Sequence, residues 1–338
     1  MRRLLILVAA LFVSCGSMAP AIAQEASPVA SPGSECAETT EQENEAIVMR
    51  WYDEVLNGQD LAVINEIIGE EADHSTSTFT DSGNREETRS IVSSLLTSYP
   101  DFQNTTDEII AEGDLVVVRW TSSGTFQEEL RGIVPTGETH TWTGINIFRI
   151  ECGMIAESWN EVDRLAQTGQ AGDDAGTPGA TDEETLAVAS PAASCPPPTE
   201  EQHEAVVMRW YEEAFNEQDL AVIDEIVADD HGHHTSLFQD SRLREDTKAS
   251  ISAVFTAFPD VTMTVDDIIS VDDVVVMRWT GSGTFDALLQ GVPPTGEAQT
   301  FTGINIFRFE CGLIVESWSE VDRLAMLGQD DEPATPEA

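Results

Sequence analysis

Lysine is nearly missing from this sequence of 338 residues: Lys248 is the only one, and lysine and arginine together number 16 against 62 aspartate and glutamate residues. The formal net charge of −46 argues against nucleic acid and anionic lipid as partners, because such an acidic surface repels phosphate groups. A well-solvated surface is the simplest interpretation of these acids. We therefore predict no nucleic-acid partner.

Apolar runs long enough to cross a membrane are also missing. Residues 1–23 begin with two arginines, continue in an apolar run that stops near Val13, and end in Ala-Ile-Ala before Gln24. That run is shorter than the ~20 residues a bilayer needs, so we predict no membrane span. The pattern is typical of a secretory signal peptide and predicts a secreted, extracellular protein. The alternative is a lipoprotein anchored through Cys15, with 16–35 as a tether.

The chain is a tandem duplication. The stretch TGINIFRIECGMIAESWNEVDRLA at 143–166 returns as TGINIFRFECGLIVESWSEVDRLA at 302–325, an offset of 302 − 143 = 159 residues. A repeat of this length is the size of a domain that buries its own core. We predict a signal peptide at 1–23 and a disordered tail at 24–35, followed by a first domain at 36–170. A linker at 171–194 leads to a second domain at 195–329 and a disordered tail at 330–338.

The few cysteines follow the same offset. Of five, Cys15 lies in the leader, and the others form matched pairs, Cys36 with Cys195 and Cys152 with Cys311. An even number of cysteines in an exported chain indicates disulfides. Four cysteines allow three pairings, and the duplication favours Cys36–Cys152 and Cys195–Cys311, because a single ancestral domain could already have made that bond. The alternative is four free, buried thiols.

Each repeat changes its hydrophobic period once along the chain. In the first repeat the spacing predicts three helices, at 43–56, 61–68 and 84–98. Asn57 and Gly58, which tolerate left-handed backbone, predict the end of the first helix, and Pro100 stops the third. The spacing then alternates as in strands, at 107–111, 115–126, 139–150 and 154–163. Helices followed by an antiparallel sheet make an α+β domain.

An ordered set of short motifs resembles the SnoaL-like polyketide or ester cyclase family, within the superfamily of nuclear transport factor 2 and ketosteroid isomerase. The motifs are Asn57, His74, Tyr-Pro-Asp at 99–101, Gly-Asp at 113–114, Pro-Thr-Gly at 135–137, Gly-Ile at 144–145 and Glu157-x-Trp159-x-x-x-Asp163. The resemblance covers 42–170 and 201–329. It implies two tandem cone-shaped domains, each with three N-terminal helices packed on a curved antiparallel sheet around an apolar pocket. The fold alone does not decide the chemistry.

The last strand suggests where a reaction would occur. Strand alternation puts Glu157, Trp159 and Glu161 on one face, together with Ile155 and Asp163, and the apolar members suggest that this face is covered. A carboxylate against apolar walls has a raised pKa and can act as a general base. The alternative is a solvated ion pair at each strand's end, with the aspartate near the arginine that follows it, Arg164 in the first repeat or Arg323 in the second.

The family resemblance assigns an aspartate as the acid/base. We carry that role to Asp163 and, by the offset, to Asp322, with His74 and His233 as their catalytic partners. The other predicted pocket residues are Trp159, Glu157, Arg119, Trp318, Glu316 and Arg278.

Histidine spacing gives no support for a metal. His74 recurs as His233, but His231 and His234 stand where the first repeat has Ala72 and Ser75. A metal site built on 231–234 would therefore exist in only one copy and would need ligands from elsewhere. We predict no metal and no cofactor.

Two classes of function fit these features best. The first is a cofactor-free cyclase or isomerase that acts by proton transfer on a small carbonyl compound. The second is a non-catalytic module that holds a small hydrophobic molecule or a partner. A purely structural extracellular module would explain disulfides, but not acids repeated on a covered face. In each case we expect the two domains to pack as an intramolecular pseudo-dimer.

Overall fold

The computed structural model describes residues 39–76, 81–170, 195 and 198–329. The predicted signal peptide, both tails and the linker lie outside these ranges. By its internal contacts the chain divides into two units, 1–36 and 37–338, and the second unit contains both repeats. No helix within the described ranges is long and apolar enough to cross a membrane.

Both repeats have the same elements in the same order. The first repeat comprises α1 (Glu41–Arg50), the π-helix η1 (Trp51–Asn57), α2 (Ile64–Ile67), β1 (Ile68–Thr76), α3 (Arg85–Ser98), β2 (Gln103–Glu112), β3 (Leu115–Thr125), β4 (Thr139–Glu151), β5 (Met154–Val162) and α4 (Arg164–Gln167). The second comprises α5 (Glu200–Arg209), η2 (Trp210–Asn216), α6 (Ile223–Ile226), β6 (Val227–Thr235), α7 (Arg244–Ala257), β7 (Thr262–Val271), β8 (Val274–Thr284), β9 (Ala298–Glu310), β10 (Leu313–Val321) and α8 (Arg323–Met326).

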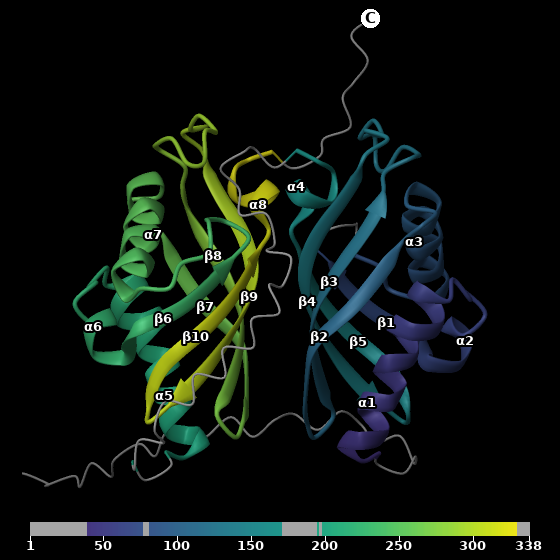
Figure 1. The fold of residues 1–338 in the computed structure, drawn as a ribbon, viewed down its shortest axis with the longest axis horizontal. Coiled ribbons are helices and arrows are strands. Elements are labelled where there is room, and N and C mark those ends of the chain that lie inside the picture. The colour runs from purple at the N-terminus through teal and green to yellow at the C-terminus, as the bar shows by residue number, and fades with distance from the viewer. Residues whose placement is uncertain (1–38, 77–80, 171–194, 196–197, 330–338) are drawn as a thin grey trace, which may run out of the picture. The chain divides into compact units, whose positions relative to one another are not determined.

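Each repeat is an α+β unit with helices on one face of a five-stranded sheet, as Figure 1 shows for α1 to α3 and for α5 to α7. The strand orders are β1-β5-β4-β3-β2 and β6-β10-β9-β8-β7. This confirms the predicted fold class, with one correction. The first strand, β1, was not predicted, and it pairs with β5 in parallel, so the sheet is mixed rather than antiparallel. Its sequence IGEEADHST lacks the alternation that indicates a strand.

The first helix ends at Asn57, where the sequence predicted, but not through left-handed backbone at Asn57 or Gly58. The Thr40 and Glu43 side chains form a capping box that starts α1, and the helix continues through η1 to Asn57. The left-handed residue is Gln59 (φ 54°), not Asn57 or Gly58. The Asn57 side chain instead donates to the backbone oxygen of Asn104 (3.0 Å) and accepts from its backbone nitrogen (2.7 Å), which ties the helix end to β2.

Each repeat buries its own apolar core between the helices and the sheet. Trp120 lies across Gly144 on the neighbouring strand, where an added Cβ would stand 2.3 Å from the indole. The Trp120 indole N–H donates to Asn146 Oδ1 at 2.6 Å.

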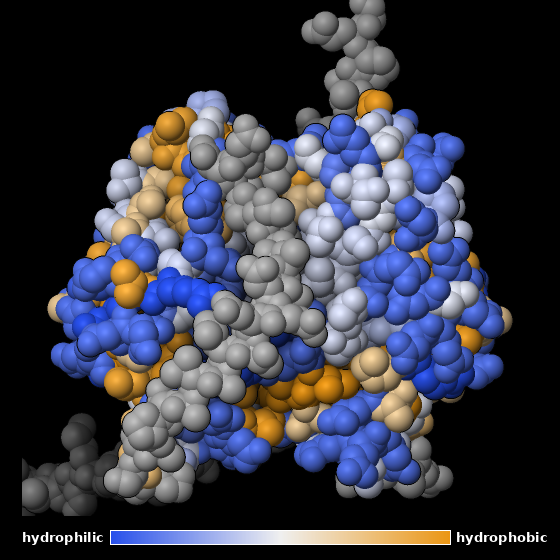
Figure 2. Space-filling view, in the orientation of Figure 1, coloured by the Kyte–Doolittle hydropathy of each residue, from blue (hydrophilic) through white to orange (hydrophobic). Residues whose placement is uncertain are grey.

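A third apolar cluster draws residues from both repeats: Val117, Ile145, Ile147, Ile269, Val274, Val276, Ile304 and Ile306. Hydrophilic residues cover most of the face seen in Figure 2, as the acidic composition predicts.

One predicted disulfide is present in the described residues. Cys195 and Cys311 are bonded, with their Cα atoms 5.6 Å apart. Cys152 is also disulfide-bonded. Its predicted partner, Cys36, lies outside the described residues.

Candidate functional site

The two faces of β5 have different surroundings, and a register shift decides which residue faces which way. Ile155 pairs with Ile150, but Glu157 pairs with Arg149, so Ala156 is an extra residue in the strand. The prediction that Ile155 shares a face with Glu157 was therefore wrong, because one extra residue reverses the alternation. Ile155 belongs to the helix-side core.

The helix-side face of the first repeat lines a partly open cavity of about 120 Å³, here called the first cavity. Ser158, Asn160 and Val162 reach it from β5, and His74 reaches it from β1. Its remaining lining comes from the helices and the other strands: Trp51, Tyr52, Leu56, Ser75, Thr76, Ser82, Thr88, Ile91, Val92, Leu95, Phe102, Asn104, Trp120, Ser122, Trp142, Asn146 and Gln167. The described part of the wall is mostly apolar, with neutral polar groups and no carboxylate, lysine or arginine.

Among the described residues of this wall, His74 is the one imidazole. Its Nδ1 shares a hydrogen bond with Ser158 Oγ, and its ring stacks on Trp51 with centroids 6.5 Å apart. The Nε2 atom is buried and has no hydrogen-bond partner among the described residues. Burial lowers the pKa of His74 to about 4, so the ring is neutral at pH 7. Because Ser158 Oγ can donate or accept, Nε2 can present either a lone pair or an N–H.

Two further polar atoms of the wall lack a partner in the described part of the chain. The Tyr52 hydroxyl and Asn104 Oδ1 are both buried and unpaired. Burial raises the pKa of Tyr52 well above its usual value, so its hydroxyl is a neutral donor. The Asn104 amide nitrogen donates to Ser122 Oγ at 2.8 Å, which fixes the side chain and leaves its oxygen open. A cavity with three such atoms is built to receive a ligand with polar groups of its own.

The matching second cavity, in the second repeat, is smaller and less polar, at about 70 Å³. Tyr211 and His233 occupy the places of Tyr52 and His74. Polar groups of the first repeat give way to apolar or smaller ones: Asn104 to Met263, Ser122 to Gly281, Asn160 to Ser319 and Gln167 to Met326. The reverse change occurs at Ile91, where the second repeat has Ser250.

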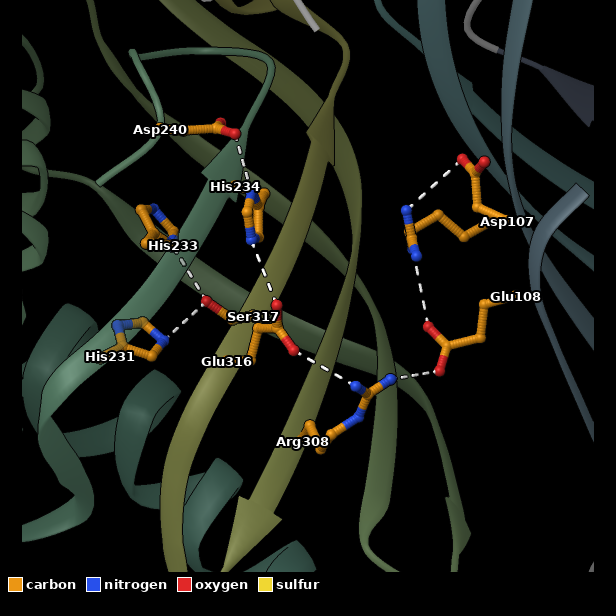
Figure 3. A network of polar contacts seen from close by, with 10 residues as sticks. Asp107, Glu108, His231, His233, His234, Asp240, Arg308, Glu316 and Ser317 are labelled. Carbon is orange, nitrogen blue, oxygen red and sulfur yellow. Dashed lines mark hydrogen bonds and ion pairs between the residues drawn. The ribbon is translucent and has the colours of Figure 1, made fainter. Parts of the chain in front are cut away.

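Histidine surroundings also differ between the cavities. In the second repeat, Ser317 Oγ lies between His233 Nδ1 (2.9 Å) and His231 Nε2 (3.0 Å), as Figure 3 shows. The other nitrogen of His231 lies 3.0 Å from Thr247 Oγ1. Burial lowers the pKa of His231 to about 3 and that of His233 to about 4. The first repeat has Ala72 in place of His231 and therefore no such chain of imidazoles and hydroxyls.

The carboxylates predicted as general bases lie elsewhere. Asp163 caps α4 by accepting from the backbone nitrogen of Ala166 (3.1 Å), and it pairs with Arg323 of the second repeat at 3.3 Å. Burial raises the pKa of Asp163, and the Arg323 charge opposes that rise. Asp322 caps α8 in the same way, through Ala325 at 3.2 Å. Neither aspartate lines the first or the second cavity, so the structure does not bring Asp163 together with His74.

The predicted pocket residues also lie outside both cavities. Two arginines lie over the ring of Trp159, with Cζ of Arg149 5.7 Å and Cζ of Arg278 5.0 Å from the ring centroid. Two others lie over the ring of Trp318, Arg119 at 4.7 Å and Arg308 at 5.0 Å. Glu157 accepts from Arg149 at 2.9 Å. Figure 3 follows the related network through Asp240, His234, Glu316, Arg308 and Glu108.

Sequence reasoning missed Tyr52, Asn104 and Ser158. Tyr52 lies at a core position of the first helix and looks like ordinary apolar packing. Ser158 alternates with the conspicuous Glu157 and Trp159, and its place opposite them was the available signal. Among the described residues, no group of three or more histidine, cysteine, aspartate or glutamate side chains could hold a metal ion.

Helices over a mixed sheet, closing around a small and mostly apolar cavity, define a small-molecule pocket of the nuclear-transport-factor-2-like class. The model of the SnoaL-like polyketide cyclase family matches residues 46–171 and 205–330. The chain belongs to this family, as the motifs predicted, and carries two copies of its domain. Membership implies a small-molecule ligand.

The chain is also similar in sequence to parts of solved structures. IdmH, a proposed polyketide cyclase from Streptomyces antibioticus, is 34% identical over 38% of this chain and 97% of its own, with a TM-score of 0.34. A proposed SnoaL-like polyketide cyclase from Jannaschia sp. CCS1 is 24% identical over 42% and 99%, with a TM-score of 0.38. AclR, a proposed hydroxylase from Streptomyces galilaeus, is 25% identical over 40% and 89%, with a TM-score of 0.36. A search of curated proteins gives no match.

Proposed function

We propose that this chain binds a compact, largely apolar carbonyl compound in the first cavity and promotes proton transfer on it. One observation carries the proposal: His74 Nε2 is buried in the wall of a cavity of about 120 Å³ and has no partner in the described residues. A cavity of this size holds about one small ring, since an engineered apolar cavity of about 150 Å³ takes benzene.

The cavity wall offers a hydrogen-bond donor for a carbonyl group and a base for its α-proton. The Tyr52 hydroxyl is a neutral donor to the carbonyl oxygen. Such a donor stabilises the negative charge that develops on that oxygen as an α-proton leaves. His74 Nε2 takes the α-proton when Nδ1–H donates to Ser158 Oγ, and the imidazolium, after exchange with solvent, returns a proton to the α-carbon.

The general-base role predicted for Asp163 and Asp322 stays a prediction, and the geometry supports His74 and His233 better. Asp163 already accepts from Ala166 and Arg323, and it is only 1% exposed. A general base must come within hydrogen-bond reach of the proton that it takes. A ligand in the first cavity has no such access to Asp163.

A non-catalytic binding module is the second candidate. It is favoured by a wall whose described residues include no carboxylate and by the pKa of about 4 for His74, which makes the imidazole a weak base at neutral pH. The ligand contacts are the same in both candidates. Only the fate of the α-proton distinguishes them.

The proposal includes export, with the signal peptide cleaved after residue 23 or, alternatively, a lipid anchor at Cys15. The disulfide between Cys195 and Cys311 supports export, because structural disulfides persist in oxidising compartments. The two repeats form an intramolecular pseudo-dimer in this proposal. Reciprocal hydrogen bonds support it, from Thr143 to Glu320 at 2.5 Å and from Thr302 to Glu161 at 2.6 Å.

Exchange of α-protons in D₂O tests the proposal with the full mature chain. Cyclohexanone is followed by proton NMR, with line broadening as the measure of binding and loss of the α-proton signal as the measure of chemistry. We expect His74→Asn to reduce exchange at least tenfold. The matched variant His233→Asn and the variant Asp163→Asn should keep most of it.

The outcomes separate the candidates. Binding without exchange in the wild type leaves the non-catalytic module. Loss of exchange in Asp163→Asn with full exchange in His74→Asn contradicts the site proposed here and restores the aspartate.

A further inference from the structure

We infer that the two cavities select different ligands, and that Asn104 makes the first cavity select a ring compound carrying a hydrogen-bond donor, an O–H or N–H group. The inference rests on the proposed function only in requiring that the first cavity bind a small molecule. It does not depend on any reaction.

The bonds around Asn104 leave one acceptor open. The backbone nitrogen and oxygen of Asn104 are bonded to Asn57, and its amide nitrogen is bonded to Ser122 on the paired strand. Asn104 is 8% exposed, and its Oδ1 has no partner in the described part of the chain. A buried carbonyl oxygen without a partner costs free energy, which a donor on the ligand recovers.

The second repeat removes this acceptor through two linked changes. Met263 replaces Asn104, and Gly281 replaces Ser122 on the paired strand. An added Cβ at Gly281 would meet Phe301 at 2.6 Å and Met263 Sδ at 3.1 Å, so the glycine leaves room first for Phe301 and then for the methionine. The volume falls from about 120 Å³ to about 70 Å³.

The cavity tyrosines and histidines do not explain this difference. Tyr52 and Tyr211 both have a buried hydroxyl without a partner among the described residues, and His74 and His233 occupy matching places. A tyrosine hydroxyl or a neutral imidazole can donate or accept, and both groups recur in the two cavities, so they favour the same ligands in each. The amide oxygen of Asn104 is therefore the acceptor that distinguishes a ligand with a donor.

Three rings of similar shape measure this selectivity on the full, oxidised chain. Phenol carries an O–H donor, anisole carries only an acceptor, and toluene carries neither. Methyl NMR reports each cavity separately, through the Ile91 methyl in the first and the Met326 methyl in the second.

The wild type should bind phenol about tenfold more tightly than toluene or anisole at Ile91, as one added hydrogen bond allows. At Met326 the three rings should differ by less than about threefold.

The paired exchange Asn104→Met with Ser122→Gly gives the first cavity the residues of the second. We expect the phenol preference at Ile91 to disappear. The reciprocal exchange, Met263→Asn with Gly281→Ser, should create a phenol preference at Met326. Asn104→Leu, which keeps the size and removes the acceptor, provides a second variant if the paired exchange does not fold.

Equal affinity for phenol and toluene at Ile91 in the wild type overturns this inference and leaves the proposed function standing. So does an unchanged phenol preference in Asn104→Leu. Tighter binding of anisole than of phenol would mean that the amide presents its N–H to the ligand, which also overturns the inference. No response of Ile91 to any of the three rings overturns both this inference and the proposed function.

Discussion

The two repeats share their backbone fold, and they differ in the side chains that line their cavities. The indole of Trp120 bonds to Asn146 at 2.6 Å, and at the matching place Trp279 bonds to Asn305 at 2.5 Å. Within this common fold the first cavity has amides where the second has methionines, and Met263 stands in place of Asn104. Strand pairing fixes where a side chain points, whereas the side chain itself can change as long as its volume fits.

The histidines likewise occupy matching backbone positions but have different neighbours. His74 and His233 each share a hydrogen bond with a serine on the last strand, Ser158 and Ser317. Only the second repeat adds His231 on the far side of that serine. The comparison indicates that β1 and β6 hold the cavity imidazole in matching places. The residue two positions earlier, Ala72 or His231, decides whether a second imidazole contacts the same serine.

The largest effect should come from the disulfide of the shared fold. Changing Cys195 and Cys311 to serine opens a loop with a sequence separation of 116 residues. We expect the free energy of unfolding to fall by about 4 to 5 kcal/mol in the chain-entropy model. The matched pair Cys36→Ser with Cys152→Ser should cost about the same if the predicted bond exists. Denaturant titration of both variants measures the free energy of unfolding. A decrease in only one of the two variants would contradict the claim that the repeats share this disulfide.

A smaller effect is expected from the ion pair between the end of the first repeat and the end of the second. Arg323→Met leaves Asp163 buried without its 3.3 Å partner and should cost about 4 kcal/mol. Adding Asp163→Asn should recover most of that loss. Arg149→Met is the control, because Arg149 is half-buried and its ion pair with Glu157 is worth about 1 kcal/mol or less. Equal losses for Arg323→Met and Arg149→Met in chemical denaturation would contradict the structural role of Asp163.

The histidines should give the repeats different acid sensitivity. The pKa of His231 falls from 6.5 to about 3 on folding, because of burial and then the charges of His233 and His234. The unfolded chain therefore binds more protons, and the stability contributed by neutral His231 is present above pH 6.5 and lost as the pH falls toward 3. We expect His231→Ala to reduce the loss of stability between pH 7 and pH 4 by about 3 kcal/mol.

The first repeat supplies the control for this acid effect. Ala72→His places a second imidazole beside Ser158 and should increase the acid sensitivity. Denaturant midpoints measured across this pH range check both variants. Parallel pH profiles for the wild type and His231→Ala would show that His231 does not contribute in this way.

The sequence predicted the helices, strands and disulfide better than the side chains that line the cavities. Three helices, four of the five strands and the disulfide between Cys195 and Cys311 followed from spacing and offset. The strand β1 did not, because Glu70, Glu71 and Asp73 interrupt its alternation, and its partner β5 lies far along the chain. Parallel pairing of this kind leaves no local turn signal.

The candidate site was partly predictable. His74 was chosen because it recurs as His233, and it does line a cavity. The faces of β5 were reversed because the extra residue at Ala156 is visible only in the pairing with β4. The partner of Asp163 was also out of reach, since Arg323 comes from the other repeat. Spacing along one strand cannot show either relation.

Imidazole NMR tests the central claim, that His74 in the first cavity is the ligand-binding group, most directly. The chain has six histidines, so ring signals labelled at Cε1 can be assigned one by one, with His74→Asn identifying the signal of His74. On adding cyclohexanone at pH 7 we expect the His74 ring signal to shift while the ring stays neutral. A ligand that binds and leaves His74 unchanged, while shifting the backbone signals of Asp163 and Arg323, would contradict the account.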